Sequence, residues 1–192
     1  NAACPAGENI QGWLFHAESG DYQAAWRHLV RDNPFPAIMG RVCYHSCESV
    51  CNRGQIDAPV GINSVERFLG DEALKQAWRF DAPAKESGKK VLVVGAGPSG
   101  AYQLRRLGHA VTVMEAGPKL GGMMRFGIPK YRLPRDVLDA EMQRIADLGV
   151  VVQLNTKVAD IAQSMADGGF DAAFLAVGAH IAKRAYIPAK DS

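Results

Sequence analysis

The sequence predicts two domains of different class: a helical domain over residues 1–80 and an α/β domain with a parallel sheet over residues 90–192. The first prediction rests on apolar residues at helical spacing in 21–33 and 62–80, with no strand-like alternation in this half of the chain. The second rests on strand-like and helical stretches that alternate after Lys90. Residues 81–89, DAPAKESGK, carry Pro, Gly, Ser and charge, and are predicted to be a linker.

Each domain has recognisable element boundaries. In the helical half, Asp21 is placed to cap a helix that begins after Gly20, and Pro34 and Pro36 are expected to end it. A second helix is expected over 62–80. In the α/β half, strands are predicted at 90–95, 110–115, 150–154 and 171–177, with helices at 98–107 and from Pro134 onward.

Composition narrows the classes of partner and location. The net charge is only +2 and no long basic run occurs, so the sequence predicts no nucleic-acid partner. No apolar stretch is long enough to cross a bilayer, and no secretory signal pattern is present, so we expect a cytoplasmic protein without a membrane partner. The chain lacks an initiator Met and stops after a strand-like segment, which we interpret as an internal fragment of a longer protein.

Four cysteines are candidate metal ligands: Cys4, Cys43, Cys47 and Cys51. Three of them are spaced four residues apart, and this spacing would place them on one face of a helical turn. A [4Fe–4S] cluster is held by about four thiolates, and we favour it as the group that these cysteines bind. A tetrahedral zinc site and a set of buried structural cysteines remain alternatives.

A glycine-rich fingerprint, VLVVGAGPSGA, follows the first predicted strand and opens a helix. Gly95 is predicted to allow the tight turn, Gly97 the approach of a pyrophosphate, and Gly100 the packing of helix on strand. Glu115 ends the next strand, at the position where a carboxylate that binds the ribose is expected. A carboxylate there argues against the 2′-phosphate of NADP. The pattern predicts a Rossmann-like dinucleotide site. A second glycine loop at 119–122 and the apolar stretch 170–179 favour FAD over NAD, which remains an alternative.

Several motifs together resemble a known family: CPAGENIQGWLFHAESGDY, RVCYHSCESVC, VVGAGPSG, GHAVTVMEAGPKLGG and FLAVGA. They resemble the glutamate synthase small (β) subunit family, and the N-terminal part of dihydropyrimidine dehydrogenase is similar. The resemblance implies a helical domain with [4Fe–4S] clusters, a partial FAD-binding Rossmann-like domain, and an NAD(P)H domain that would follow this chain. It also implies that electrons pass from NAD(P)H through FAD and the clusters to a partner, such as a glutamate synthase large subunit.

The resemblance also implies roles for individual residues. Cys51 would serve one cluster whose other ligands lie upstream of Asn1, while Cys4, Cys43 and Cys47 would serve a second. Glu66 matches the position of a glutamine that completes the second cluster in dihydropyrimidine dehydrogenase. The implied FAD-binding residues are Gly95, Ala96, Gly97, Pro98, Ser99, Gly100, Glu115, Leu120, Gly121, Gly122, Met123, Arg132 and Val158.

One departure from the family pattern concerns the fingerprint helix. The family has three further residues between the last glycine of the fingerprint and AYQL, whereas here Gly100 runs directly into Ala101. We expect the loop to form, with an apolar stripe of Ala101, Leu104 and Leu107, and FAD affinity to be reduced.

The predicted function is that of an NAD(P)H-dependent electron-transfer flavoprotein fragment, without a catalytic acid or base of its own. The alternative is a non-catalytic adaptor, stabilised by zinc or a cluster, with a degenerate Rossmann half.

Overall fold

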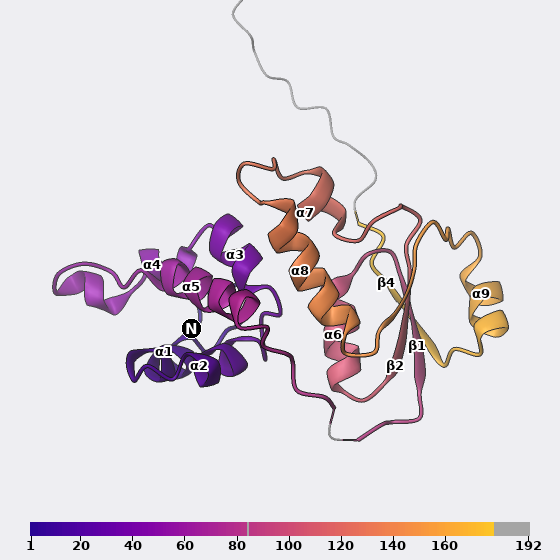
Figure 1. The fold of residues 1–192 in the computed structure, drawn as a ribbon, viewed down its shortest axis with the longest axis horizontal. Helices are drawn as coiled ribbons and strands as arrows, with labels where there is room; N and C mark the ends of the chain where they lie inside the picture. Colours follow the sequence, from indigo (N-terminus) through magenta and orange to yellow (C-terminus); the bar gives the residue numbers. More distant parts are fainter. Residues whose placement is uncertain (84, 179–192) are drawn as a thin grey trace, which may run out of the picture.

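A computed structural model describes residues 1–83 and 85–178 and has a helical part beside an α/β part (Figure 1). The helical part consists of α1 (Ile10–Glu18), α2 (Tyr22–Leu29), α3 (Pro36–Val42), α4 (Ser46–Ser49), the 3-10 helix η1 (Asn52–Gln55) and α5 (Ile62–Lys75). The α/β part consists of β1 (Lys90–Val94), α6 (Pro98–Arg106), β2 (Ala110–Met114), α7 (Gly122–Phe126), α8 (Arg135–Ala146), β3 (Val151–Gln153), α9 (Ile161–Gly168) and β4 (Ala172–Leu175). None of the described helices combines the length and apolarity that crossing a membrane requires.

Side-chain caps and two glycines organise the helical part. Asn9 and Asp21 accept hydrogen bonds from backbone N–H groups in the first turns of α1 and α2. A methyl group at Gly70 would overlap the backbone of Ala37, and one at Gly40 would overlap the backbone of Arg67. The backbones of α3 and α5 therefore lie in direct contact, which side chains at these two positions would prevent.

The four strands form one parallel sheet in the order β3-β2-β1-β4. Val91 pairs with Val111 on one side and with Ala172 on the other, so β1 is central. Helices α6 and α8 lie on the side of the sheet that faces the helical part, and α9 lies on the other side (Figure 1). This arrangement brings the carboxyl ends of β1 and β2 to the same edge of the sheet.

The two parts are joined by buried polar contacts. The carboxylate of Glu141, on α8, is completely buried and accepts hydrogen bonds from the N–H groups of Ala37 (3.1 Å) and Ile38 (3.0 Å) in the first turn of α3. The hydroxyl of Tyr102, on α6, donates to the carbonyl oxygen of Val30 at 2.7 Å. Buried apolar side chains from both parts form one continuous core. The helical part and the α/β part therefore pack against each other as a unit.

The structure confirms the predicted fold class, a helical domain followed by an α/β domain with a parallel sheet, and corrects some details. The predicted helix 62–80 ends at Lys75. Pro36 begins α3 instead of ending a helix, because a proline in the first turn loses no helical hydrogen bond. Of the apolar stripe predicted on α6, Ala101 is buried, whereas Leu107, at the C-cap of the helix, is 68% exposed. Positions 179–192 of the predicted second domain lie outside the described residues.

We predict that Glu141→Ala lowers the free energy of unfolding by about 3 kcal/mol, because it leaves two buried N–H groups without an acceptor. Urea unfolding measures this loss. Glu18→Ala, which removes an exposed carboxylate from α1, is the control and should change the stability little. A loss below about 1 kcal/mol at Glu141 would contradict the role assigned to this contact.

We also predict a pH dependence from the same carboxyl. Burial raises the pKa of Glu141 from 4.5 to about 8, although the two N–H groups favour the ionised form. The folded chain then holds more protons than the unfolded chain between these values, so the free energy of unfolding falls as the pH rises through this window. Glu141→Gln removes this titration and should flatten the slope by up to ~1.4 kcal/mol per pH unit. Parallel slopes for the two proteins would disprove the assignment.

Candidate functional site

Three cysteines and two glutamates, Glu8 and Glu66, line a common cavity of about 320 Å³ in the helical part. Cys4 comes from the turn before α1, Cys43 follows α3, Cys47 lies on α4 and Glu66 on α5. The structure thus brings together side chains from three regions that are distant in the sequence, around Cys4, around Cys43 and Cys47, and at Glu66.

The backbone around these cysteines is not the continuous helix that their spacing predicted. Helix α3 ends at Val42, Cys43 is extended, and His45 adopts the left-handed conformation with φ of 54° before α4 begins. Cys43 and Cys47 therefore reach the cavity from two short helices separated by a turn. This turn directs the N–H of His45 toward the Sγ of Cys43, 3.4 Å away. Backbone N–H groups near sulfur ligands are one means of tuning an iron–sulfur site.

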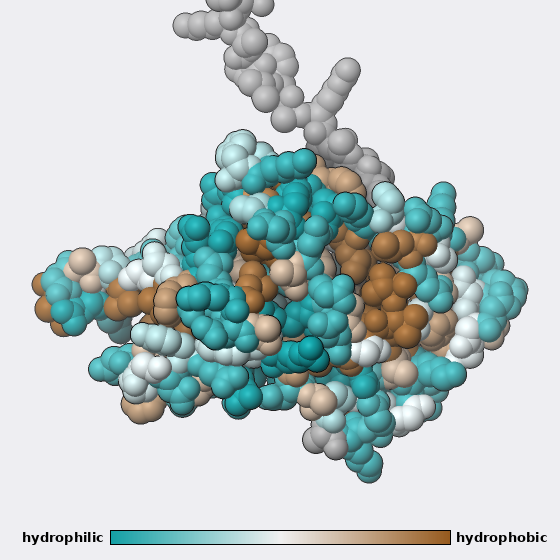
Figure 2. Space-filling view, viewed as in Figure 1, coloured by the Kyte–Doolittle hydropathy of each residue, from teal (hydrophilic) through white to brown (hydrophobic). Residues whose placement is uncertain are grey.

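Cys51 does not line this cavity. It follows α4 at the start of a segment that carries η1 and projects away from the body of the protein (Figure 1). Hydrogen bonds from backbone N–H groups, that of Val60 foremost, lower the pKa of the Cys51 thiol. Val50 and Ile56 on this segment are 63% and 80% exposed, and Figure 2 shows hydrophobic surface on the projection. The structure thus separates Cys51 from the other three cysteines.

Two buried carboxyls flank the cysteine cavity. Asn33 donates from Nδ2 to Glu66 at 2.7 Å and to Glu8 at 3.0 Å. Burial, and then the charge of Glu8, raises the pKa of Glu66 to about 8. Burial also raises the pKa of the Cys47 thiol, and the neighbouring Cys4 and Cys43 add to this effect. Both shifts favour the protonated forms of Glu66 and Cys47, and a metal group that binds these side chains must displace their protons.

The cavity suits a polynuclear group better than a single ion. Within residues 1–83 and 85–178, no three His, Cys, Asp or Glu side chains lie close enough together to hold one metal ion. Tetrahedral zinc, with Zn–S bonds of about 2.3 Å, needs its sulfurs ~3.8 Å apart. A [4Fe–4S] cube binds thiolates at its corners and so separates them more widely. Three thiols around a cavity of about 320 Å³ fit this second geometry.

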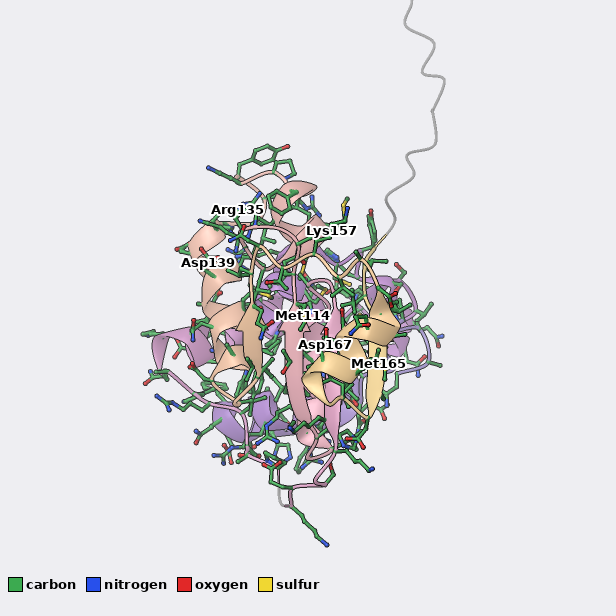
Figure 3. All side chains as sticks on the ribbon, turned by 90° about the vertical axis from the view of Figure 1, so that its right-hand side faces the viewer. Met114, Arg135, Asp139, Lys157, Met165 and Asp167 are labelled. Atoms are coloured by element: carbon green, nitrogen blue, oxygen red, sulfur yellow. The ribbon has the colours of Figure 1, made fainter. Side chains whose placement is uncertain are left out.

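A second and larger cavity, of about 670 Å³, opens at the carboxyl ends of β1 and β2. Seven of the residues predicted to bind the dinucleotide line it: Gly95, Ala96, Glu115, Gly121, Gly122, Met123 and Val158. The sequence analysis missed other lining residues, among them Met114 and Lys157, which Figure 3 shows near the upper end of the sheet. Their position just before or after the end of a parallel strand was the available signal.

The remaining predicted residues support the loop or lie elsewhere. Pro98 and Leu120 face a small apolar hollow beneath the loop, and the exposed Arg132 does not line the large cavity. Gly97 and Gly100 also do not line it, but added side chains there would overlap Ala176 and the ring of Phe174. These two glycines therefore let the start of α6 pack closely against β4 and the residue after it.

The loop itself depends on Gly95 and Glu115. Gly95 has φ of +93°, and a Cβ atom there would lie 2.6 Å from the carbonyl oxygen of Ala176. The carboxylate of Glu115 accepts a hydrogen bond from the N–H of Gly117 at 2.7 Å and lies at the cavity wall. Both features leave backbone and one acid facing the space where a dinucleotide would lie.

One short segment separates the two cavities. Gly95 and Ala96 line the larger cavity, whereas Ser99, in the first turn of α6, lines the cysteine cavity. Tyr102, one turn further along α6, ties this helix to the end of α2. Groups bound in the two cavities would therefore lie on opposite sides of the same loop.

Two family models match the chain, one in each part. Residues 1–78 match the family described as dihydropyrimidine dehydrogenase domain II, 4Fe-4S cluster. Residues 93–150 match the NAD(P)-binding Rossmann-like domain.

Curated relatives align with nearly the whole chain. The NADP(+)-dependent formate dehydrogenase subunit beta of Moorella thermoacetica is 36% identical over 98% of this chain and 30% of its own length. The glutamate synthase [NADPH] small chains of Bacillus subtilis and Escherichia coli are each 33% identical, over 100% and 98% of this chain and 40% and 42% of their own lengths. The chain thus spans less than half of each of these relatives.

Both family matches follow the order of the two domains, and the relatives are named as oxidoreductases or as subunits of them. In the order of its two parts the chain is therefore similar to the glutamate synthase small chains: the helical part matches a 4Fe-4S cluster family and the α/β part a Rossmann-like family.

Proposed function

We propose that this chain is the part of an NAD(P)H-dependent electron-transfer flavoprotein that holds FAD and a [4Fe–4S] cluster. FAD would occupy the cavity at Gly95 and Glu115, and the cluster would occupy the cavity lined by Cys4, Cys43 and Cys47, with Glu66 as the fourth candidate ligand. When bound, the flavin accepts an electron pair and releases electrons singly to iron–sulfur clusters. The protein supplies orientation and electrostatics, and no acid or base in this chain is needed for that transfer.

The observation that carries this proposal is the loop shared by the two cavities. Gly95 and Ala96 lie on its flavin side and Ser99 on its cysteine side. A chain that only bound a nucleotide would not need a cavity lined by thiols behind its phosphate-binding loop. The arrangement is suited to passing electrons between two bound groups.

We further propose that electrons leave toward a partner subunit or domain. Relatives are named as beta subunits or small chains, and one, the glutamate synthase [NADH] of Schizosaccharomyces pombe, contains a matching region within only 9% of its length. Cys51 would serve a second cluster, because it lies away from the first cavity on the projecting segment.

NAD at the glycine loop is a second candidate, favoured by the description of the family that matches residues 93–150. The two cofactors differ in colour. Anaerobic reconstitution of the full-length protein should yield iron, labile sulfide and a flavin spectrum, whereas NAD at this loop would leave the protein without the flavin bands. Absence of both iron and flavin would overturn the proposal and favour the non-catalytic adaptor.

For the cysteine cavity, we predict that Cys47→Ser removes one cluster, because a serine hydroxyl is a poorer ligand for iron than a thiolate. Iron and sulfide analysis, with electron paramagnetic resonance of the reduced protein, measures the loss. Cys51→Ser should remove a different signal and leave the Cys47-dependent one. Ser49→Ala, an exposed change on α4, should retain both. If Cys47→Ser and Cys51→Ser removed the same signal, the division of cysteines would be wrong.

For the larger cavity, we predict that Glu115→Gln weakens FAD binding about tenfold or more, because it replaces a charge-assisted hydrogen bond to a ribose hydroxyl with a neutral one. Flavin fluorescence during titration of the apoprotein gives the dissociation constant. Asp167→Asn on α9 makes the same chemical change away from this cavity and should leave the constant unchanged. Equal affinity of Glu115→Gln and the unaltered protein would exclude Glu115 as the ribose ligand.

A further inference from the structure

A small pocket lies at the seam between the two domains, away from both candidate cofactor cavities. It has a volume of about 170 Å³ and is lined by residues from the end of the helical part, the linker, α6 and the end of α8. Three of the lining residues are arginines: Arg79, Arg105 and Arg144. This volume leaves room for one small oxyanion together with water.

Arg144 is a buried cation whose Nη1 atom lacks a hydrogen-bond acceptor in the described part of the chain. Its side chain is only 6% exposed, and its guanidinium lies over the rings of Trp26 at 5.2 Å and Phe80 at 5.8 Å. A guanidinium stays charged in proteins, so burial without acceptors is costly.

The nearest carboxylate does not satisfy this charge. Glu141 Oε1 lies 3.8 Å from Arg144 Nη1, which is beyond hydrogen-bond distance. Both oxygens of Glu141 already accept N–H groups from the first turn of α3. The cation–π contacts favour the cation but supply no acceptor for its N–H groups.

The other charges around the pocket leave its arginines in excess. Arg105 donates to Glu86 at 2.7 Å, and Asp147 accepts from Gln143 at 2.8 Å. Arg79 is exposed at the rim and makes no ion pair within residues 1–83 and 85–178. Three cations thus face two carboxylates, one of which is already paired with Arg105.

We propose that this seam pocket binds a small oxyanion of the phosphate or sulfate class, held by Arg144 from within and Arg79 at the rim. A tetrahedral oxyanion offers several hydrogen-bond acceptors to the planar fork of a guanidinium. The described residues offer no such acceptor to Arg144 Nη1. The pocket contacts the helical part through Phe80, the linker through Ala82 and Pro83, and the α/β part through Arg144. A bound oxyanion would therefore strengthen the attachment between the two domains.

Thermal unfolding of the cofactor-loaded, full-length protein tests this proposal with inorganic phosphate as the probe. Sodium phosphate in the low millimolar range, compared with sodium chloride at equal ionic strength, should raise the Tm in a saturable manner. This range lies below the concentrations at which phosphate stabilises proteins by exclusion from their surfaces. With the dinucleotide already bound, the glycine loop is not available to the added phosphate. Without a saturable rise, the proposal is refuted and the pocket holds water.

Two substitutions locate the effect. Arg79→Ala changes an exposed residue and should raise the apparent dissociation constant for phosphate about tenfold. This is the equivalent of losing one charge-assisted hydrogen bond. Arg144→Met keeps an apolar side chain against Trp26 and should abolish the response. Arg53→Ala, on the projecting segment, should leave it unchanged. If Arg144→Met fails to fold, Arg79→Ala decides alone, and an unaltered response in that variant overturns the proposal.

Discussion

The carboxyl group of Glu141 makes the contact on which the arrangement of the helical and α/β parts depends. It accepts two N–H groups from the first turn of α3, where they have no intrahelical partner. The positive end of the helix dipole favours the ionised carboxylate, while complete burial opposes it. Because its partners lie on α3 and it lies on α8, this contact fixes the α/β part against the helical part.

The geometry of the candidate site follows from this contact. Helix α3 is held at its start by Glu141 and along its length by α5, where Gly40 and Gly70 allow the backbones to touch. Its far end is followed by Cys43, and α5 carries Glu66, so both ligand candidates are fixed relative to α8. Tyr102 fixes α6, and with it the loop at Gly95, to the same helical part. The thickness of the wall between the two cavities is therefore set by buried packing.

The sequence predicted what is local and missed what depends on tertiary contacts. The order of β1, α6 and β2 and the turn at Gly95 were predictable because strand alternation, helical spacing and the need for glycine are short-range properties. The break at Cys43 was not, since it depends on a left-handed His45, a conformation that the spacing of cysteines does not reveal. The separation of Cys51 was implied only by family resemblance, and the role of Glu141 became visible only once α3 lay beside α8.

Glu66 shows how such tertiary contacts bear on the chemistry of the site. By the resemblance, this position matches a glutamine of dihydropyrimidine dehydrogenase, and an ionised carboxylate in its place would add a negative charge. However, burial and the neighbouring Glu8 raise the pKa of Glu66 to about 8, and Asn33 holds its carboxyl group at 2.7 Å. At neutral pH the side chain is therefore mostly an uncharged acid, close to glutamine in size and polarity. The exchange becomes chemically conservative in this setting, and only a bound metal group, by displacing the proton, would make Glu66 an anionic ligand.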